Sequence, residues 1–210
     1  MIAALFVDSD GCYIDVPGVD AWPVERDARN YAGDNPIIAH PPCKLWTKLA
    51  RVNFARYGGE HNRPGNDGGC FAFALATVEK CGGVIEHPAT SYAWRDHGLD
   101  VPHIRGWVPS RKGYVCEVWQ SAYGHRASKA TWLYYVGNSK PFALNWDRPR
   151  GEFQVGWTDT AEGRVNKPTL SARESRATPV LFRDELIALA KHSANAASAN
   201  AKLARREVPK

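Results

Sequence analysis

Residues 36–47 read PIIAHPPCKLWT, and this stretch indicates both the fold class and a candidate site. Two isoleucines and an alanine lead into Pro41 and Pro42, which cannot donate to a β-ladder, so a buried strand is expected to stop at His40. In an open α/β sheet, ligands bind in the crevice beyond the carboxyl ends of the strands. The pattern therefore predicts that Cys43 lies in a stiff loop at such an edge. The alternative is a cysteine packed in the core.

The composition is that of an ordinary globular chain. Of its 210 residues, 44% are hydrophobic and 23% are charged, which suffices for one folded domain, expected over residues 1–191. Residues 192–210 are rich in Ala, Asn and basic side chains, which favours a weakly packed basic tail. No apolar run approaches the roughly 18 residues that a membrane span needs, and Asp8 interrupts any signal-peptide core. We therefore expect a cytoplasmic protein that does not enter a membrane.

The cysteines suggest neither a disulfide framework nor a metal site. Five of them are widely scattered without a CxxC pair, so free thiols are expected. His40 and Cys43 have the spacing of zinc ligands, and His87, His125 and Cys116 could join them. A turn through two prolines, however, orients these side chains poorly for one ion. We expect no metal.

The charge of the chain is uneven. Its formal net charge is +5, yet residues 126–210 hold 15 Lys or Arg against 8 Asp or Glu, whereas residues 1–125 hold 12 against 14. A basic surface attracts a phosphate backbone without regard to sequence. DNA or a nucleotide is therefore the expected partner, and a solvated face with a basic tail is the alternative. The sequence indicates no protein partner.

The hydrophobic pattern predicts an α/β fold in which strands and helices alternate. Strands are expected over residues 2–7, 13–16, 36–39, 83–85, 114–123 and 131–136. Helices are expected over residues 24–31, 70–80 and 178–190, with 44–57 helical or irregular and 58–69 and 103–112 as loops. In the last helix, Thr178 is the expected N-cap and Pro179 the first helical residue.

A second predicted strand also ends in reactive side chains. Residues 83–85 lead into Glu86, His87 and Pro88, the same relation to a strand end that Cys43 has. A carboxylate at the mouth of a crevice can hold or protonate a ring nitrogen if its pKa is raised. The alternative is a strand-ending glutamate in solvent.

Two further turns carry groups that could face a ligand. The connector of residues 124–130 reads GHRASKA, and its imidazole and two cations suit an anionic or hydrogen-bonding ligand. These side chains are His125, Arg126 and Lys129. After the first strand, Asp8 and Asp10 either face a ligand or simply form a turn.

The spacing of these motifs resembles that of a known family. HPPC at residues 40–43, with Glu86 and His87 some 40 residues later, resembles the Pro-Cys and Glu-Asn motifs of DNA (cytosine-5) methyltransferases, and still more the short phage-type relatives of that family. The segments YGHRASKATWLY (123–134) and LSARESRATPVLFRDELIALA (170–190) extend the likeness over most of the chain. The resemblance implies a truncated Rossmann-like, methyltransferase-type sheet with flanking helices and a C-terminal helix.

The resemblance also implies roles for the candidate residues. Cys43 would be the nucleophile that adds to C6 of a pyrimidine, and Glu86 would contact N3 and the exocyclic group. A thiolate suits this step because it is soft, nucleophilic and able to leave again by β-elimination. Arg126 or Lys129 would replace the family's arginine motif near O2 and the phosphate. The other expected substrate-binding residues are His40, Pro42, Thr47, His87 and His125.

The cofactor is the point at which the sequence departs most from the family. The resemblance implies S-adenosylmethionine, with Asp8 and Asp10 as the candidate cofactor-binding residues. The family's first strand, however, leads into a glycine-rich turn, whereas LFVDSDGCY (5–13) has a single glycine. The chain is also too short before residue 36 for the usual two βα units, and a target-recognition domain is absent. These departures argue against the cofactor.

Three functions remain open from the sequence. The first is an enzyme that modifies a pyrimidine base in nucleic acid through Cys43, assisted by Glu86. The second is an enzyme that modifies free nucleotides with a different cofactor. The third is a non-catalytic DNA-binding protein that retains a degenerate methyltransferase scaffold.

Overall fold

The computed structural model describes residues 1–155 and 167–204, with side chains as far as residue 194. Its centre is a seven-stranded mixed sheet of order β2-β1-β3-β4-β7-β6-β5. The strands are β1 (Ile2–Val7), β2 (Val19–Pro23), β3 (Ile37–Ala39), β4 (Gly83–Pro88), β5 (Val108–Ser110), β6 (Gly113–Trp119) and β7 (Ala130–Val136). The α-helices are α1 (Lys48–Tyr57), α2 (Cys70–Cys81), α3 (Tyr92–Asp96), α4 (Ala172–Arg176) and α5 (Val180–Ala204). The 3-10 turns are η1 (Val24–Arg26), η2 (Ala28–Asn30), η3 (Lys44–Trp46), η4 (Glu60–Asn62) and η5 (Gln120–Tyr123).

The sheet is parallel on one side and antiparallel on the other. Strands β2, β1, β3 and β4 run parallel, whereas β4, β7, β6 and β5 pair antiparallel. Strands β1 and β3 are buried on both faces, which explains their continuous apolar sequences. The expected α/β class, with flanking helices and a C-terminal helix, is confirmed.

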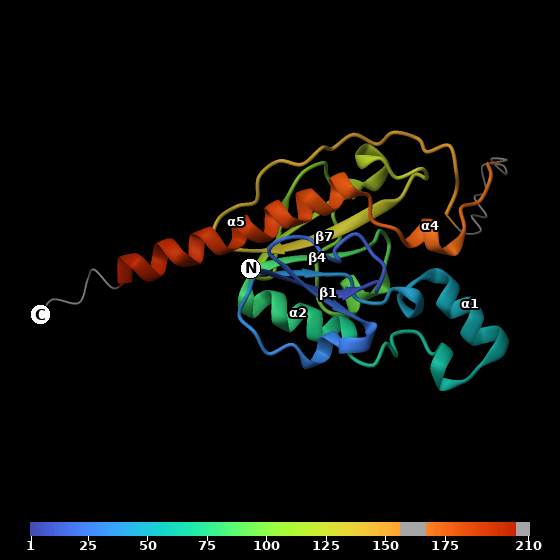
Figure 1. The fold of residues 1–210 in the computed structure, drawn as a ribbon. Helices are drawn as coiled ribbons and strands as arrows, with labels where there is room; N and C mark the ends of the chain where they lie inside the picture. The colour runs from blue at the N-terminus through green and yellow to red at the C-terminus, as the bar shows by residue number, and fades with distance from the viewer. Residues whose placement is uncertain (156–166, 205–210) are drawn as a thin grey trace, which may run out of the picture.

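Helices cover both faces of the sheet (Figure 1). Side chains alternate along β1: Ala3 and Leu5 pack on the face covered by α2, whereas Ile2 and Ala4 pack on the face covered by α5. The helices bury apolar stripes against these faces, because burial of such side chains is the main favourable term in folding. The stripes consist of Phe71, Ala74, Leu75 and Val78 on α2, and of Phe182, Leu186, Leu189 and Ala190 on α5.

Two N-terminal expectations are wrong. Residues 13–16 form turns rather than a strand, and the strand lies at Val19–Pro23 instead. Gly18, at φ +81°, turns the chain back alongside β1, while Tyr13 is buried in the cluster that includes α5. Residues 24–31 form two 3-10 turns rather than one helix, because Asp27 adopts φ 43° and caps the second turn.

The C-terminal half also differs from the expected pattern. The strand expected over residues 114–123 ends at Trp119, and a 3-10 turn follows. A short strand, β5, forms where a loop was expected. Helix α5 continues past Ala190 to Ala204, and the boundary expected after residue 191 falls inside it. His192 still bonds Ser139 Oγ at 2.9 Å. Residues 205–210 of the expected tail lie outside the described residues.

None of the helices in the described part of the chain combines the length and the apolar character that crossing a membrane would require.

Candidate active site

The candidate site lies where β1, β3 and β4 end. Ala39 pairs with both Leu5 and Ile85, so the next residues along β3 and β4, His40 and Glu86, lie at the same level of the sheet. The chain leaves β1 on the α5 face, where Tyr13 is buried, but leaves β3 on the α2 face, where Trp46 is buried. Adjacent parallel strands whose connections depart to opposite faces leave a crevice between them.

Glu86 is the centre of a buried hydrogen-bond network. Its Oε2 lies 3.0 Å from His40 Nδ1, and its Oε1 accepts from Gln120 Nε2 at 2.9 Å. His40 Nε2 in turn lies 2.9 Å from the Tyr13 hydroxyl. Burial alone raises the pKa of Glu86, but the hydrogen bond and charge of His40 and the charge of Lys129 outweigh it and lower the pKa to about 2. Glu86 is therefore a carboxylate at neutral pH, with both oxygens bonded within the protein.

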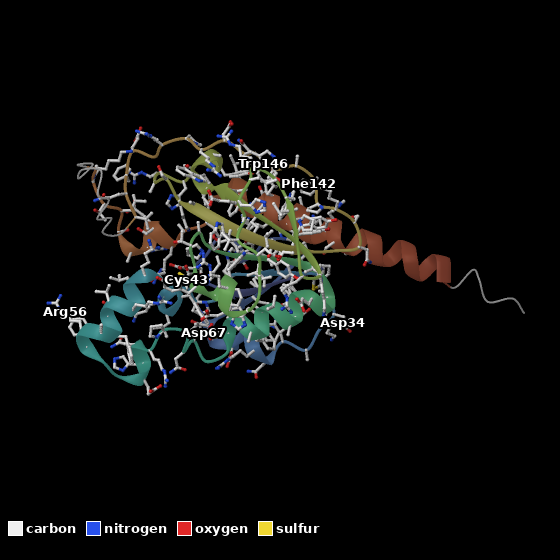
Figure 2. All side chains as sticks on the ribbon, turned by 180° about the vertical axis from the view of Figure 1, so that it is seen from behind. Asp34, Cys43, Arg56, Asp67, Phe142 and Trp146 are labelled. Atoms are coloured by element: carbon white, nitrogen blue, oxygen red, sulfur yellow. The ribbon has the colours of Figure 1, made fainter. Side chains whose placement is uncertain are left out.

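The turn through Pro41 and Pro42 places Cys43 at the end of the sheet where β3 stops. Pro41 is buried, Pro42 is exposed and Cys43 is half-buried, and the Cys43 carbonyl accepts from Trp46 N at 2.9 Å to start η3. Figure 2 shows Cys43 at the end of the sheet from which α1 departs. Burial and the charge of Glu86 raise the pKa of the thiol, so the resting side chain is a protonated thiol.

Lys129 is the cation of this site. Its Nζ donates to the carbonyls of Arg176 and Ala177 at 3.2 and 3.3 Å. Burial lowers the pKa of Lys129, while the charges of Glu86 and Cys43 oppose that shift. The thiol pKa is correspondingly lowered by Lys129 and Arg176, although burial dominates. Lys129 and Arg176 therefore counter the charge that a Cys43 thiolate would carry.

His125 and Arg126, the other candidate residues of the 124–130 connector, turn elsewhere. His125 and Arg126 line a hollow of about 180 Å³ between this connector and the segment that joins α4 to α5. His125 Nδ1 bonds the backbone of Ala127, and Arg126 pairs with Glu174 at 2.7 Å. A second hollow, of about 280 Å³, lies at the opposite end of the sheet. Neither hollow includes Cys43 or Glu86 in its lining.

His87 points away from Glu86. It follows Glu86 in β4 and therefore points to the opposite face, where it is 1% exposed and stacks on Trp94 at 6.2 Å. Its Nδ1 bonds Ser91 Oγ at 2.7 Å, and burial lowers its pKa to about 4. His87 is thus a neutral core histidine. Thr47 is half-buried, and its hydroxyl donates to the Lys44 carbonyl at 3.4 Å.

The turn after β1 places Asp8 and Asp10 at the same edge. Both are exposed, and Asp10 Oδ2 pairs with Arg173 at 2.6 Å. Asp8 lies within electrostatic reach of Lys129 and raises its pKa. The two acids therefore border the site from the β1 side.

Three residues of the site were not predicted from the sequence: Tyr13, Gln120 and Arg176. Tyr13 was assigned to a strand, and Gln120 to the middle of another, where a strand pattern gives no sign of a bond to Glu86. Arg176 looks like any other cation of a basic segment. Only the bonds of His40, Glu86 and Lys129 reveal these three, because the contacts join segments far apart in the chain.

Within residues 1–155 and 167–194, no cluster of three or more His, Cys, Asp or Glu side chains is arranged to hold a metal ion. His40, which has zinc-like spacing from Cys43, has both ring nitrogens bonded to Glu86 and Tyr13.

Comparisons of the chain with protein-family models, with curated proteins and with solved structures gave no match.

Proposed function

We propose that this chain adds reversibly to a pyrimidine base in nucleic acid, with Cys43 as the nucleophile. The observation that carries the proposal is the meeting of a half-buried thiol, an ionised buried Glu86 and the Lys129 ammonium at one end of three parallel strands. Perturbed titratable groups that gather at such an edge are typical of functional sites. The resemblance of the HPPC and EHP motifs to cytosine-5 methyltransferases supplies the substrate class.

The scaffold is proposed to be a truncated Rossmann-like sheet of the methyltransferase type. The parallel order β2-β1-β3-β4 and the crevice between β1 and β3 support this assignment. The chain between β1 and β3 supplies one parallel strand and two 3-10 turns, which fits a shortened first half.

The proposed chemistry is reversible addition across the C5–C6 bond. The Cys43 sulfur bonds to C6 as its proton leaves to solvent, the π pair moves to C5, and C5 takes a proton from water. Loss of the original C5 proton then expels the thiolate and restores the base. Lys129 favours the thiolate by its charge, which lowers the thiol pKa.

Glu86 acts through His40 in this proposal. Direct contact with the base would require one of its two oxygens, and these are bonded to His40 and Gln120. A carboxylate that holds the Nδ1 side of an imidazole fixes the orientation of the ring. Glu86 is therefore a positioning residue.

The turn after β1 does not fit S-adenosylmethionine. Asp10 is paired with Arg173, and the Gly11 amide donates to the Asp8 carbonyl at 3.0 Å. A Cβ on Gly11 would lie 2.9 Å from that carbonyl oxygen, so the glycine closes the turn and does not open a cradle. The proposed chemistry therefore ends at addition and proton exchange, which need no methyl donor.

Helix α1 favours a polynucleotide over a free nucleotide. The helix begins five residues after Cys43, projects from the body of the molecule and buries only Ala50 (Figure 1).

The surface of this helix is basic and partly apolar. Between Cys43 and Gly59 there is no carboxylate, and the exposed cations are Lys44, Lys48, Arg51 and Arg56. Figure 2 shows Arg56 at the outer end of α1, and we refer to this projecting helix as the basic arm. Leu49, Val52 and Tyr57 are more than half exposed beside the cations. Cations that alternate with apolar and aromatic groups suit a phosphate backbone and unstacked bases.

Covalent trapping tests the proposal. Oligonucleotides that contain 5-fluorocytosine, whose fluorine activates C6 towards addition, should yield a reversible covalent complex with the protein, detected by native mass spectrometry with and without S-adenosylmethionine. The complex should be lost in Cys43→Ser and retained in Cys81→Ser, a matched control because Cys81 is also half-buried but lies at the opposite end of the sheet.

Other outcomes would contradict the proposal. DNA binding that persists in Cys43→Ser, with no complex formed by the wild type, would identify a non-catalytic DNA-binding protein. That alternative draws support from the full bonding of both Glu86 oxygens. Saturable binding of a mononucleotide that DNA does not displace would identify an enzyme of free nucleotides.

A further inference from the structure

Helix α4 and the residue after it contact three charged residues at the Cys43 end of the sheet. Arg173 pairs with Asp10 at 2.6 Å, and Glu174 pairs with Arg126 at 2.7 Å. The carbonyls of Arg176 and Ala177 accept from Lys129 Nζ. One short helix therefore engages an acid after β1 and two cations of the 124–130 connector. Glu174 presents an anionic carboxylate to Arg126, as a phosphate would.

These contacts are weak individually. The side chains of Arg173 and Asp10 are 78% and 67% exposed, and those of Arg126 and Glu174 are 56% and 46% exposed. Exposed ion pairs contribute little because water and salt screen them. Helix α4 buries none of its own residues. Polar contacts, rather than a packed apolar face, hold it in place.

The helix is nevertheless fixed at both of its ends. Leu170 is buried, and its amide donates to the Gln154 carbonyl at 3.1 Å. On the other side, Phe182 is fully buried at the start of α5. A capping box between Ser171 and Glu174 keeps α4 helical independently of the site. The segment between Leu170 and Phe182 is thus a strap with firm ends and a loosely held middle.

The strap lies at the same end of the sheet as Cys43. Arg176, the last residue of α4, lowers the pKa of the Cys43 thiol by its charge. Lys129, which donates two hydrogen bonds to carbonyls of the strap, lowers the pKa of the same thiol. Figure 1 places α4 at the end of the sheet from which α1 departs, and Figure 2 shows Cys43 at that end.

We propose that this strap is autoinhibitory: its helix α4 occupies charged groups around the Cys43 end of the sheet and is displaced by an anionic ligand. Glu174 holds the position on Arg126 that a phosphate takes, and Arg173 neutralises Asp10 until the strap moves. The inference concerns access to Cys43 and does not depend on the pyrimidine chemistry.

Alkylation of Cys43 by iodoacetamide, quantified by peptide mass spectrometry, tests this proposal without any substrate. The double variant Arg173→Gln/Glu174→Gln breaks both ion pairs but keeps the capping box, since glutamine also serves at that position. Loss of two exposed pairs should raise the alkylation rate of Cys43 about fivefold. Cys70, half-buried at the start of α2, is the internal reference and should be unchanged.

Two controls make the outcome decisive. Lys80→Gln removes an exposed pair with Asp34 at the other end of the sheet and should leave the Cys43 rate unchanged. For the wild type, raising the salt to about 1 M should bring the Cys43 rate towards that of the double variant, because screening weakens exposed pairs. An unchanged Cys43 rate in the double variant, or an equal rise at Cys70, would overturn the proposal.

Discussion

Glu86 keeps its negative charge in a buried position because its neighbours supply hydrogen bonds and positive charge. Burial alone would favour the neutral acid, yet the bonds from His40 and Gln120 and the charge of Lys129 favour the carboxylate. Removal of this single charge would leave the Lys129 ammonium without the negative charge that favours it. The stability of the site therefore depends on the ionisation of Glu86.

Replacement of Glu86 by glutamine should destabilise the fold by about 3 kcal/mol at neutral pH, since a broken buried pair leaves an uncompensated charge. Because the folded-state pKa lies below the ordinary value of 4.5, the carboxylate stabilises the wild type above that pH. This contribution is lost as the pH falls from 4.5 to about 2. Urea unfolding at several pH values measures both effects.

The matched control for this variant is Glu174→Gln, which alters an exposed carboxylate and should change stability by less than about 0.5 kcal/mol. Equal destabilisation by the two variants, or an acid-induced loss of stability that persists unchanged in Glu86→Gln, would show that Glu86 is not the buried ionised group described above.

The proximity of Cys43 and Glu86 follows from two apolar runs that end in proline motifs, and the sequence therefore predicted that both would reach one edge. Their partners could not be predicted in this way. Residue Gln120 reaches Glu86 because the chain leaves β6 in a 3-10 turn, and Tyr13 reaches His40 from a turn that looked like a strand. His87 was assigned to the site because it adjoins Glu86, although alternation along a strand sends neighbours to opposite faces.

At the scale of elements, the pairing of β3 with β4 sets the level at which His40 and Glu86 meet. Gly83 begins β4 at φ +127°, and a Cβ there would lie 2.0 Å from the Ile37 carbonyl oxygen. Only glycine permits this approach of the two backbones. The register that brings the two side chains together therefore requires a glycine at residue 83.

Gly83→Ala should destabilise the protein by at least about 3 kcal/mol, because a strained φ and a clash with backbone add together. Gly18→Ala is the control: its φ is +81°, but no atom lies within 4 Å of the added Cβ, so only the strain of about 1 kcal/mol applies. Thermal unfolding of both variants measures the difference. A Gly83→Ala variant as stable as Gly18→Ala would contradict the described register.

The elements with strong periodicity were predicted correctly, and those without it were not. The apolar residues of β1 and α2 form clear patterns in the sequence, and these patterns predict a strand and a helix. By contrast, β2 is only half-buried along its length, and β5 is three residues long, so neither leaves an apolar pattern. Helix α5 continues past its apolar stripe, and there the amphipathic pattern no longer marks the helix end.

At the scale of the whole molecule, the basic surface is not confined to the C-terminal half. Residues 1–125 carry more acidic than basic side chains. Within them, however, every charged side chain of α1 is basic. Net charge counted along the chain therefore missed this arm, because its cations are offset by acids elsewhere in the fold. The arm extends outward from the Cys43 end of the sheet (Figure 1).

The triple variant Lys48→Gln/Arg51→Gln/Arg56→Gln should weaken binding of single-stranded DNA and flatten its salt dependence. If each cation meets one phosphate, the slope of log K against log salt should fall by about 2. Fluorescence anisotropy at several salt concentrations measures the slope. The charge-matched control Lys80→Gln/Lys112→Gln/Lys140→Gln should leave it unchanged; an equal loss in both would show that only net charge matters.

The most direct test of the central claim is exchange of the hydrogen at C5 of a pyrimidine in DNA, measured by mass spectrometry in deuterated water. Reversible addition of Cys43 to C6 predicts deuterium at C5 with the wild type and with Cys81→Ser, and none with Cys43→Ser. Exchange that persists in Cys43→Ser, or its absence from the wild type while DNA remains bound, would contradict a nucleophilic role for Cys43.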